Sequence, residues 1–159
     1  RTFKKITTTR KIDIVSTAEP WVTRILQAGN ALLWKSANEI VPGLQLSAIT
    51  YGPNLLQKNR DVGQRFMVAY LKAVRQYNQG KTERNLEIIA KHTGFDRKLL
   101  QETCWVAMHD SGQINVDSVL DFEAWALKKG LLDKIVTADQ FWDDSFIQYA
   151  NQVLDSASQ

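Results

Sequence analysis

The chain has 159 residues, of which 44% are hydrophobic, so it can bury one core of ordinary size but is short for two independent ones. No stretch approaches the roughly 20 consecutive apolar residues of a membrane span, and the opening RTFKKITTTR has no apolar run that could act as a secretion signal. A lone cysteine, Cys104, excludes an internal disulfide. With two histidines it is too small a ligand set to predict a metal or a cofactor.

The formal net charge of +3 is carried by the start of the chain. Residues 1–11 contain five basic side chains and no acidic one, which leaves 15 basic against 17 acidic residues in the remainder. Reading a nucleic-acid groove usually requires a basic stripe on a folded face, and no DNA- or RNA-binding motif is present. The sequence therefore predicts no nucleic-acid partner.

Three short apolar segments in the first third predict strands. IDIVST (12–17) and ALLWKS (31–36) are apolar runs of strand length, and LQLSAITYG (44–52) alternates apolar and polar residues with a period of two. A short helix is predicted between the first two, from Pro20 at a favourable first position to Ala28, with Gly29 as its stop. SANEIVPG (36–43) is predicted to be a loop.

From Pro53 onward the patterns are helical. PNLLQKN predicts a single turn, and residues 61–79 a long helix whose inward face carries Val62, Phe66, Tyr70, Ala73 (with Val74) and Tyr77. N-caps at Thr82, Asp96 and Asn115 predict further helices. A capping box at Thr137 and Gln140 begins the last one. The ranges predicted for these helices are 83–93, 97–109, 116–129 and from 137 to the frayed tail.

Strands followed by a run of about five helices predict an α/β or α+β fold. The helices, with four tryptophans beyond Trp21, need a broader surface to cover than three strands provide. We therefore expect the chain to be part of a larger architecture.

The residues of reactive chemistry do not form a catalytic constellation. His92 lies in the last turn of a predicted helix, where it complements the dipole, and Cys104 beside Trp105 is typical of a small buried hydrophobe. DSGQI (110–114) lacks the alternating ligands of a calcium loop, and the glycines are isolated rather than clustered as in a phosphate-binding loop. The sequence predicts no enzyme activity.

Glu19-Pro20-Trp21 follows the first predicted strand, and ligands of parallel α/β sheets bind where strands lead into helix N-termini. Two interpretations remain open. Glu19 could charge the helix start while Trp21 packs in the core, or both could contact a ligand.

Five segments follow one another in a recognisable order and spacing: RKIDIVSTAEPW (10–21), EIVPG (39–43), residues 53–79, LEIIAKHTGFDRKLLQ (86–101) and residues 112–134. Together they resemble the second half of periplasmic substrate-binding proteins of ABC importers, in the branch for nitrate, taurine, aliphatic sulfonates and thiamine-precursor pyrimidines. The resemblance implies part of a type 2 periplasmic-binding-protein fold. Residues 1–10 would be a basic N-terminal segment, 11–155 the C-terminal half of the two-lobed fold, and 156–159 a frayed tail.

The resemblance also implies a function. The chain would be the periplasmic or extracytoplasmic component that binds a small organic solute between two lobes and delivers it to a membrane permease. Its ligand-binding residues would be Thr17, Glu19 and Trp21, with Tyr51 at the end of the returning strand. Trp21 could stack on a planar ligand, and Glu19 could accept from an amine or ring N–H.

Two alternatives come with this interpretation. The chain could be a helical interaction module derived from the same fold, forming a homodimer if the first lobe is absent. A thiamine-pyrimidine synthase of related fold is disfavoured, because that enzyme carries a cysteine-rich motif and this chain has one cysteine.

Overall fold

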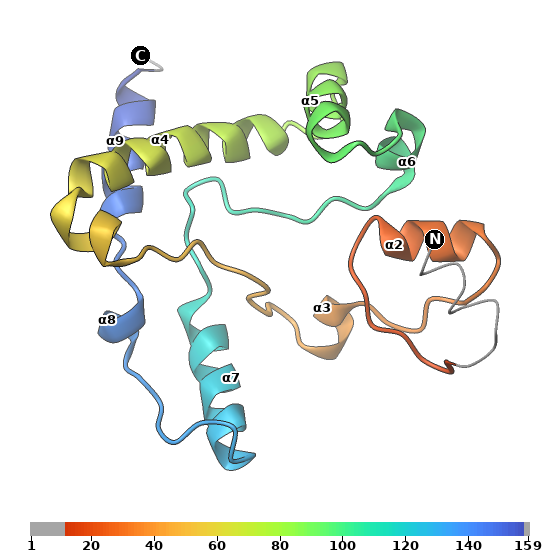
Figure 1. The fold of residues 1–159 in the computed structure, drawn as a ribbon, viewed down its shortest axis with the longest axis horizontal. Coiled ribbons are helices and arrows are strands. Elements are labelled where there is room, and N and C mark those ends of the chain that lie inside the picture. Colours follow the sequence, from red (N-terminus) through yellow and green to blue (C-terminus); the bar gives the residue numbers. More distant parts are fainter. Residues whose placement is uncertain (1–11, 158–159) are drawn as a thin grey trace. The chain divides into compact units, whose positions relative to one another are not determined.

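The computed structural model describes residues 12–157, and all regular structure in this range is helical (Figure 1). The predicted α/β fold is therefore wrong, since none of residues 12–157 lies in a β-strand. The predicted basic segment 1–10 lies outside the described range. The elements are α2 (Trp21–Gln27), α3 (Ala37–Ile40), the short π-helix η1 (Asn54–Lys58), α4 (Arg60–Tyr77), α5 (Glu83–Thr93), α6 (Arg97–Glu102), α7 (Val116–Lys128), α8 (Ala138–Phe141) and α9 (Ser145–Ser156).

The chain forms two compact units, each built from two separate stretches. The described residues of unit 1 are 12–36 and 79–107, and those of unit 2 are 37–78 and 108–157. Unit 1 contains α2, α5 and α6, and unit 2 contains the remaining helices.

Unit 1 is held by a few buried aliphatic side chains and by local caps. Thr82 accepts a hydrogen bond from the Asn85 amide at 3.2 Å, and Asp96 caps α6 through the amides of Lys98 and Leu99, as the sequence predicts. Gly94 ends α5 at a φ of 70°, a conformation that glycine adopts without strain. The buried apolar residues of this unit are Ile25, Leu86, Leu99 and Leu100.

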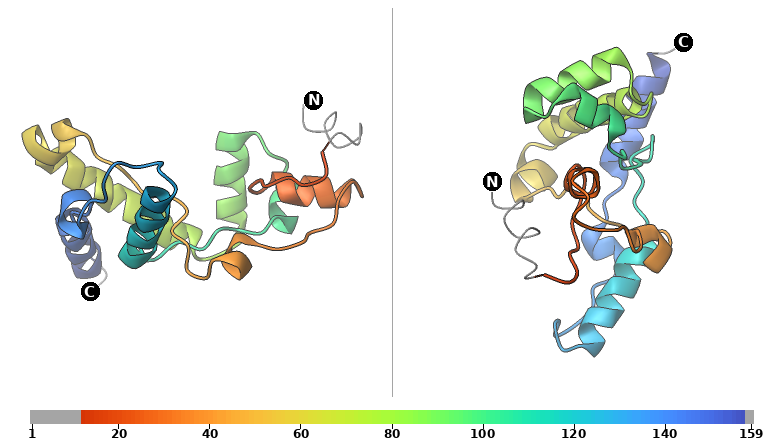
Figure 2. Two further views of the ribbon diagram at one scale, coloured as in Figure 1. Left: turned by 90° about the horizontal axis from the view of Figure 1, so that it is seen from below. Right: turned by 90° about the vertical axis from the view of Figure 1, so that its right-hand side faces the viewer.

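Unit 2 is centred on α4 and α9, which lie against each other (Figures 1 and 2). Their buried side chains form one cluster of Met67, Leu71, Phe146, Ile147 and Ala150. The start of α7 is tied to the chain after α3. The Gln45 amide donates to Ser118 Oγ at 2.9 Å, and Asn115 Nδ2 donates to the Gly43 carbonyl at 2.7 Å.

The three predicted strands are irregular segments in the structure. Residues 31–35 make no backbone hydrogen bond with any described residue, and the Leu32 and Trp34 side chains are 95% and 78% exposed. A strand requires a neighbouring strand to satisfy its amides and carbonyls, and no other part of residues 12–157 pairs with these segments. The prediction of strands in these three segments is therefore wrong, because it rested on local β propensity alone.

The inward face of α4 is displaced by one residue from most of the predicted one. Gly63, Met67 and Leu71 are buried in place of the predicted Val62 and Phe66, which are about half exposed, whereas the predicted Val74 is buried. A Cβ at Gly63 would lie 2.8 Å from Phe146 Cε1, so the absence of a side chain there lets α9 approach. This close contact fixes which face of α4 is inward.

Two predicted helices are shorter than the sequence suggested. The helix expected over 97–109 ends at Glu102, because the backbone of Thr103 is extended, with a ψ of 141°. Trp105 Nε1 then donates to the Leu100 carbonyl at 3.0 Å and satisfies one acceptor at the helix end. The helix expected from Thr137 divides into α8 and α9. At this break the Asp143 carboxylate accepts from the Ser145 amide at 3.0 Å and satisfies an otherwise unpaired donor at the start of α9.

Candidate functional site

The loop before α2 is organised by the carboxylate of Glu19. The N-cap residue of α2, Pro20, has no side-chain hydrogen bond to offer the helix. Glu19 Oε2 takes this role by accepting from the Thr23 amide at 3.0 Å and from Thr23 Oγ1 at 2.9 Å. The Trp21 amide donates to the Ala18 carbonyl at 3.1 Å, and the Glu19–Pro20 peptide bond is cis. Of the two interpretations of Glu19, stabilisation of the helix start therefore has direct geometric support.

Among residues 12–157, the indole of Trp21 lies close to the ring of Phe95 and to the guanidinium of Arg24. Its ring centroid lies 6.4 Å from that of Phe95, edge to face at 88°. The guanidinium carbon of Arg24 lies 5.0 Å from the Trp21 ring centroid and 5.3 Å from that of Phe95. Both rings are half-buried and Arg24 is exposed, so the cluster has an apolar base and a charged, solvent-facing rim.

Local structure explains how these side chains meet. Trp21 and Arg24 are three residues apart on α2 and therefore lie on one face of the helix. Phe95 lies in the tight connection between Gly94, which ends α5, and Asp96, which caps α6. Sequence reasoning singled out neither Arg24 nor Phe95. The spacing of Trp21 and Arg24 was a usable signal, but nothing local marked Phe95.

Three of the four predicted ligand residues therefore lie in one part of unit 1. Thr17, Glu19 and Trp21 fall within five residues of each other, and all three are half-buried. Tyr51 belongs to unit 2. The candidate site accordingly consists of residues from unit 1 only.

Tyr51 contacts the core of unit 2. Its hydroxyl donates to the Gly63 carbonyl at 2.7 Å, and its ring lies edge-on to Phe146 and Phe66 at centroid distances of 4.9 and 5.9 Å. Burial raises the pKa of the Tyr51 phenol above 10.0. These contacts are those of a packing residue with a satisfied hydroxyl.

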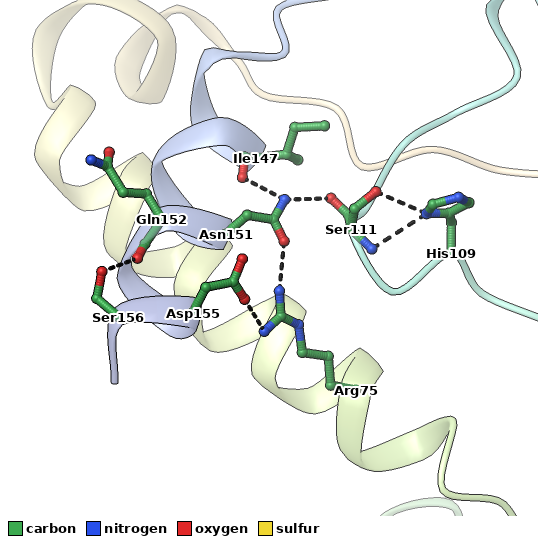
Figure 3. Close-up of polar contacts among 8 residues, drawn as sticks. All are labelled: Arg75, His109, Ser111, Ile147, Asn151, Gln152, Asp155 and Ser156. Atoms are coloured by element: carbon green, nitrogen blue, oxygen red, sulfur yellow. Dashed lines mark hydrogen bonds and ion pairs between the residues drawn. The ribbon is translucent and has the colours of Figure 1, made fainter. Parts of the chain in front are cut away.

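A second polar cluster lies in unit 2, where the turn after Met108 meets α4 and α9 (Figure 3). The Ser111 amide donates to His109 Nδ1 at 3.3 Å, and Ser111 Oγ lies 2.8 Å from the same nitrogen. Asn151 Nδ2 donates to the Ser111 carbonyl at 2.9 Å, and Arg75 Nη2 donates to Asn151 Oδ1 at 2.8 Å. Arg75 also forms an ion pair with Asp155 at 2.8 Å.

This cluster does not have the form of a hydrolytic site. The Ser111 amide makes Nδ1 an acceptor, so the neutral imidazole carries its proton on Nε2. A catalytic base needs a third group to orient it, and no described residue contacts the Nε2 of His109. We interpret the cluster as a clip that joins the turn to the two packed helices.

Neither a cluster of metal-ligating side chains nor a membrane-spanning helix is present among the described residues. No group of three metal-ligating side chains comes together among residues 12–157. None of the helices described is both long and apolar enough to cross a bilayer.

Comparisons with protein-family models, with curated proteins and with solved structures found no match to this chain.

Proposed function

We propose that this chain binds a small organic solute and serves as the extracytoplasmic solute-binding component of an ABC importer, with the Glu19–Trp21 loop as its recognition surface. The observation that carries the proposal is the contact of Trp21 with Phe95 and Arg24 at the start of α2, where the Glu19 carboxylate caps the helix through Thr23. The resemblance of five segments of the sequence supplies the class of protein. The predicted sheet is no part of the argument, since residues 12–157 form none.

The chemistry of the cluster suits a small, partly apolar ligand. Binding sites for such ligands are mostly apolar and carry a few polar groups that fix orientation. Trp21 and Phe95 provide half-buried aromatic surface, and Arg24 provides charge-assisted donors. The Glu19 hydrogen bonds to Thr23 both end on Oε2, so Oε1 has no partner among the described residues and could accept from an amine.

A thermal-shift screen of the full chain tests the proposal. The compounds are taurine, ethanesulfonate, an aminopyrimidine and nitrate, and we expect at least one of them to raise the unfolding temperature. Trp21→Ala should abolish that increase. Trp34→Ala is the matched control, because Trp34 belongs to the same unit, is 78% exposed and lies outside the cluster. A screen without any shift, or a shift that Trp21→Ala leaves intact, would contradict the proposal.

A second function is favoured by the surface of α7. Phe122 and Trp125 are 58% and 49% exposed, and their ring centroids lie 5.5 Å apart. Exposed apolar side chains continue after the helix at Leu131 and Ile135. Contiguous exposed apolar surface often marks an interface with another protein. The second candidate is a dimerisation module in which two copies of this chain pair through the α7 surface.

Light scattering at several concentrations separates this candidate from a monomeric binder. A dimer that Phe122→Ser weakens, and that Leu32→Ser in the other unit leaves intact, would support pairing through α7. A monomer at all concentrations would exclude it.

A further inference from the structure

Arg24 differs from most of the arginines in the described part of the chain in having no acidic partner. Arg60, Arg65, Arg75 and Arg97 each form an ion pair with a carboxylate. Arg24 makes no ion pair or side-chain hydrogen bond with any residue in the range 12–157. The closest acidic residue in sequence, Glu19, is engaged with Thr23.

The two aromatic rings nevertheless give the Arg24 guanidinium a defined position. Its carbon lies within 5.3 Å of both ring centroids, which is inside the range of cation–π attraction. The Arg24 side chain is exposed and makes no hydrogen bond with any of residues 12–157, so its N–H donors are available to a ligand. A guanidinium presents these donors in a fixed fork, which matches the oxygens of a carboxylate or sulfonate.

Arg84 provides the contrast. It is the other described arginine without an ion pair, it is exposed on α5, and no aromatic ring of residues 12–157 lies within cation–π range of it. An arginine of this kind must lose the rotamer freedom of its side chain when it binds an anion. Arg24 already lies within cation–π range of the Trp21 and Phe95 rings, so less of that freedom remains to be lost.

We propose that the Arg24 guanidinium binds the oxyanion of the solute, a sulfonate or carboxylate, while Trp21 and Phe95 contact its apolar part. This inference rests on the proposed solute-binding function and narrows it to organic anions. It assigns Arg24 the role of determining ligand class, and Glu19 the role of holding the loop through Thr23.

Isothermal titration of the full chain with ethanesulfonate and with ethyl methyl sulfone, its neutral analogue, tests the assignment. We expect ethanesulfonate to bind and the sulfone to bind at least about tenfold more weakly, since hydrogen bonds to charged groups are the stronger ones. Propionate should bind as ethanesulfonate does, because its carboxylate presents the same pair of oxygens.

Variants of the two unpaired arginines complete the test. Arg24→Gln should weaken ethanesulfonate binding about tenfold or more, and Arg24→Lys should give an intermediate loss, because it keeps the charge without the fork. Arg84→Gln should bind as the unmodified chain does. Circular dichroism confirms folding of each variant, and the sulfone comparison in the unmodified chain does not depend on any variant.

The possible outcomes distinguish the role of Arg24 in anion binding from the proposed solute-binding function. Equal binding of sulfone and sulfonate, an Arg24→Gln chain with full affinity, or an equal loss in Arg84→Gln would overturn the role of Arg24. A chain that binds only a neutral pyrimidine would overturn the anion assignment and leave the solute-binding function standing. Failure of every compound in the thermal-shift screen would overturn both.

Discussion

The Tyr51 hydroxyl donates a 2.7 Å hydrogen bond to the carbonyl of Gly63, and Tyr51 Cε2 would lie only 3.1 Å from a Cβ built on Gly63. The same Cβ would lie 2.8 Å from Cε1 of Phe146, a side chain that is 2% exposed. The chain before η1, the first turn of α4 and the first turn of α9 thus meet at a position where only glycine fits.

Gly63→Ala should destabilise unit 2 by up to about 2 kcal/mol, because overpacking costs about 1–3 kcal/mol and the better helix propensity of alanine offsets about 1 kcal/mol of this. Urea unfolding followed by circular dichroism measures the change. Gly52→Ala is the matched control, since no atom lies within 4 Å of a Cβ at Gly52. If the two variants are equally stable, the close contact at Gly63 is not a constraint.

Tyr51→Phe should cost about 0.5–1.5 kcal/mol, the net value of a typical hydrogen bond. Tyr149→Phe serves as the control, because Tyr149 is 38% exposed and its hydroxyl makes no hydrogen bond with any of residues 12–157. The raised pKa of Tyr51 means that its contribution to stability is complete below the ordinary value of 10.0 and is lost as the pH rises through the folded value. In an ultraviolet absorbance titration, Tyr51→Phe should therefore remove a component that ionises above pH 10.0.

Asn151→Ala should loosen the turn at Ser111 and destabilise unit 2 by about 1–3 kcal/mol, because it leaves part-buried partners without a hydrogen bond. The Asn151 amide donates to the carbonyls of Ser111 and Ile147 and accepts from Arg75. Hydrogen exchange should increase in residues 108–112. Gln152→Ala, on the exposed side of α9, should leave exchange there unchanged. Equal exchange in the two variants would mean that the clip does not order the turn.

The lowered pKa of Asp143 should make the stability of the folded chain depend on pH in the acid range. The Ser145 hydroxyl, with a smaller contribution from Arg60, holds the pKa of Asp143 below its ordinary value of 3.8 although partial burial opposes this. A lowered folded pKa gives stability that is present above the unfolded value and lost as the pH falls through the folded one. Asp143→Asn should therefore lose stability less steeply below pH 3.8 in thermal unfolding.

At neutral pH the same substitution should cost under about 1 kcal/mol, since the Arg60 and Asp143 side chains are 44% and 42% exposed. Ser145→Ala removes the main cause of the lowered pKa and should shift the acid transition in the same direction as Asp143→Asn. Acid unfolding identical to that of the unmodified chain in both variants would contradict this account.

The sequence predicted the helix starts well because N-capping is local. Thr82, Asp96 and Asn115 each accept from an amide two or three residues ahead, so the donor and the acceptor are visible within one turn of sequence. The inward face of α4 was missed because Gly63 counts as a weak residue in a helical pattern, whereas its value lies in contact with Phe146, 83 residues away.

The predicted strands and the candidate site both depend on contacts between residues that are far apart in the sequence, which a local pattern does not reveal. ALLWKS has the composition of a strand, but a strand needs a partner that no segment of the described chain provides. Glu19 and Trp21 were visible as candidates because a carboxylate and an indole interrupt an apolar run. Phe95 was not, since its contact with Trp21 spans 74 residues and depends on how α2 and α6 pack.

The central claim is that a small solute binds at Trp21, and the indole N–H signals in a nitrogen–proton correlation spectrum test it most directly. Substitution of each tryptophan assigns the five signals. On addition of taurine, ethanesulfonate or an aminopyrimidine, the Trp21 signal should move in a saturable manner, while those of Trp34 and Trp125 stay in place. A Trp21 signal that none of these compounds moves, or that moves no more than those of Trp34 and Trp125, would contradict the account.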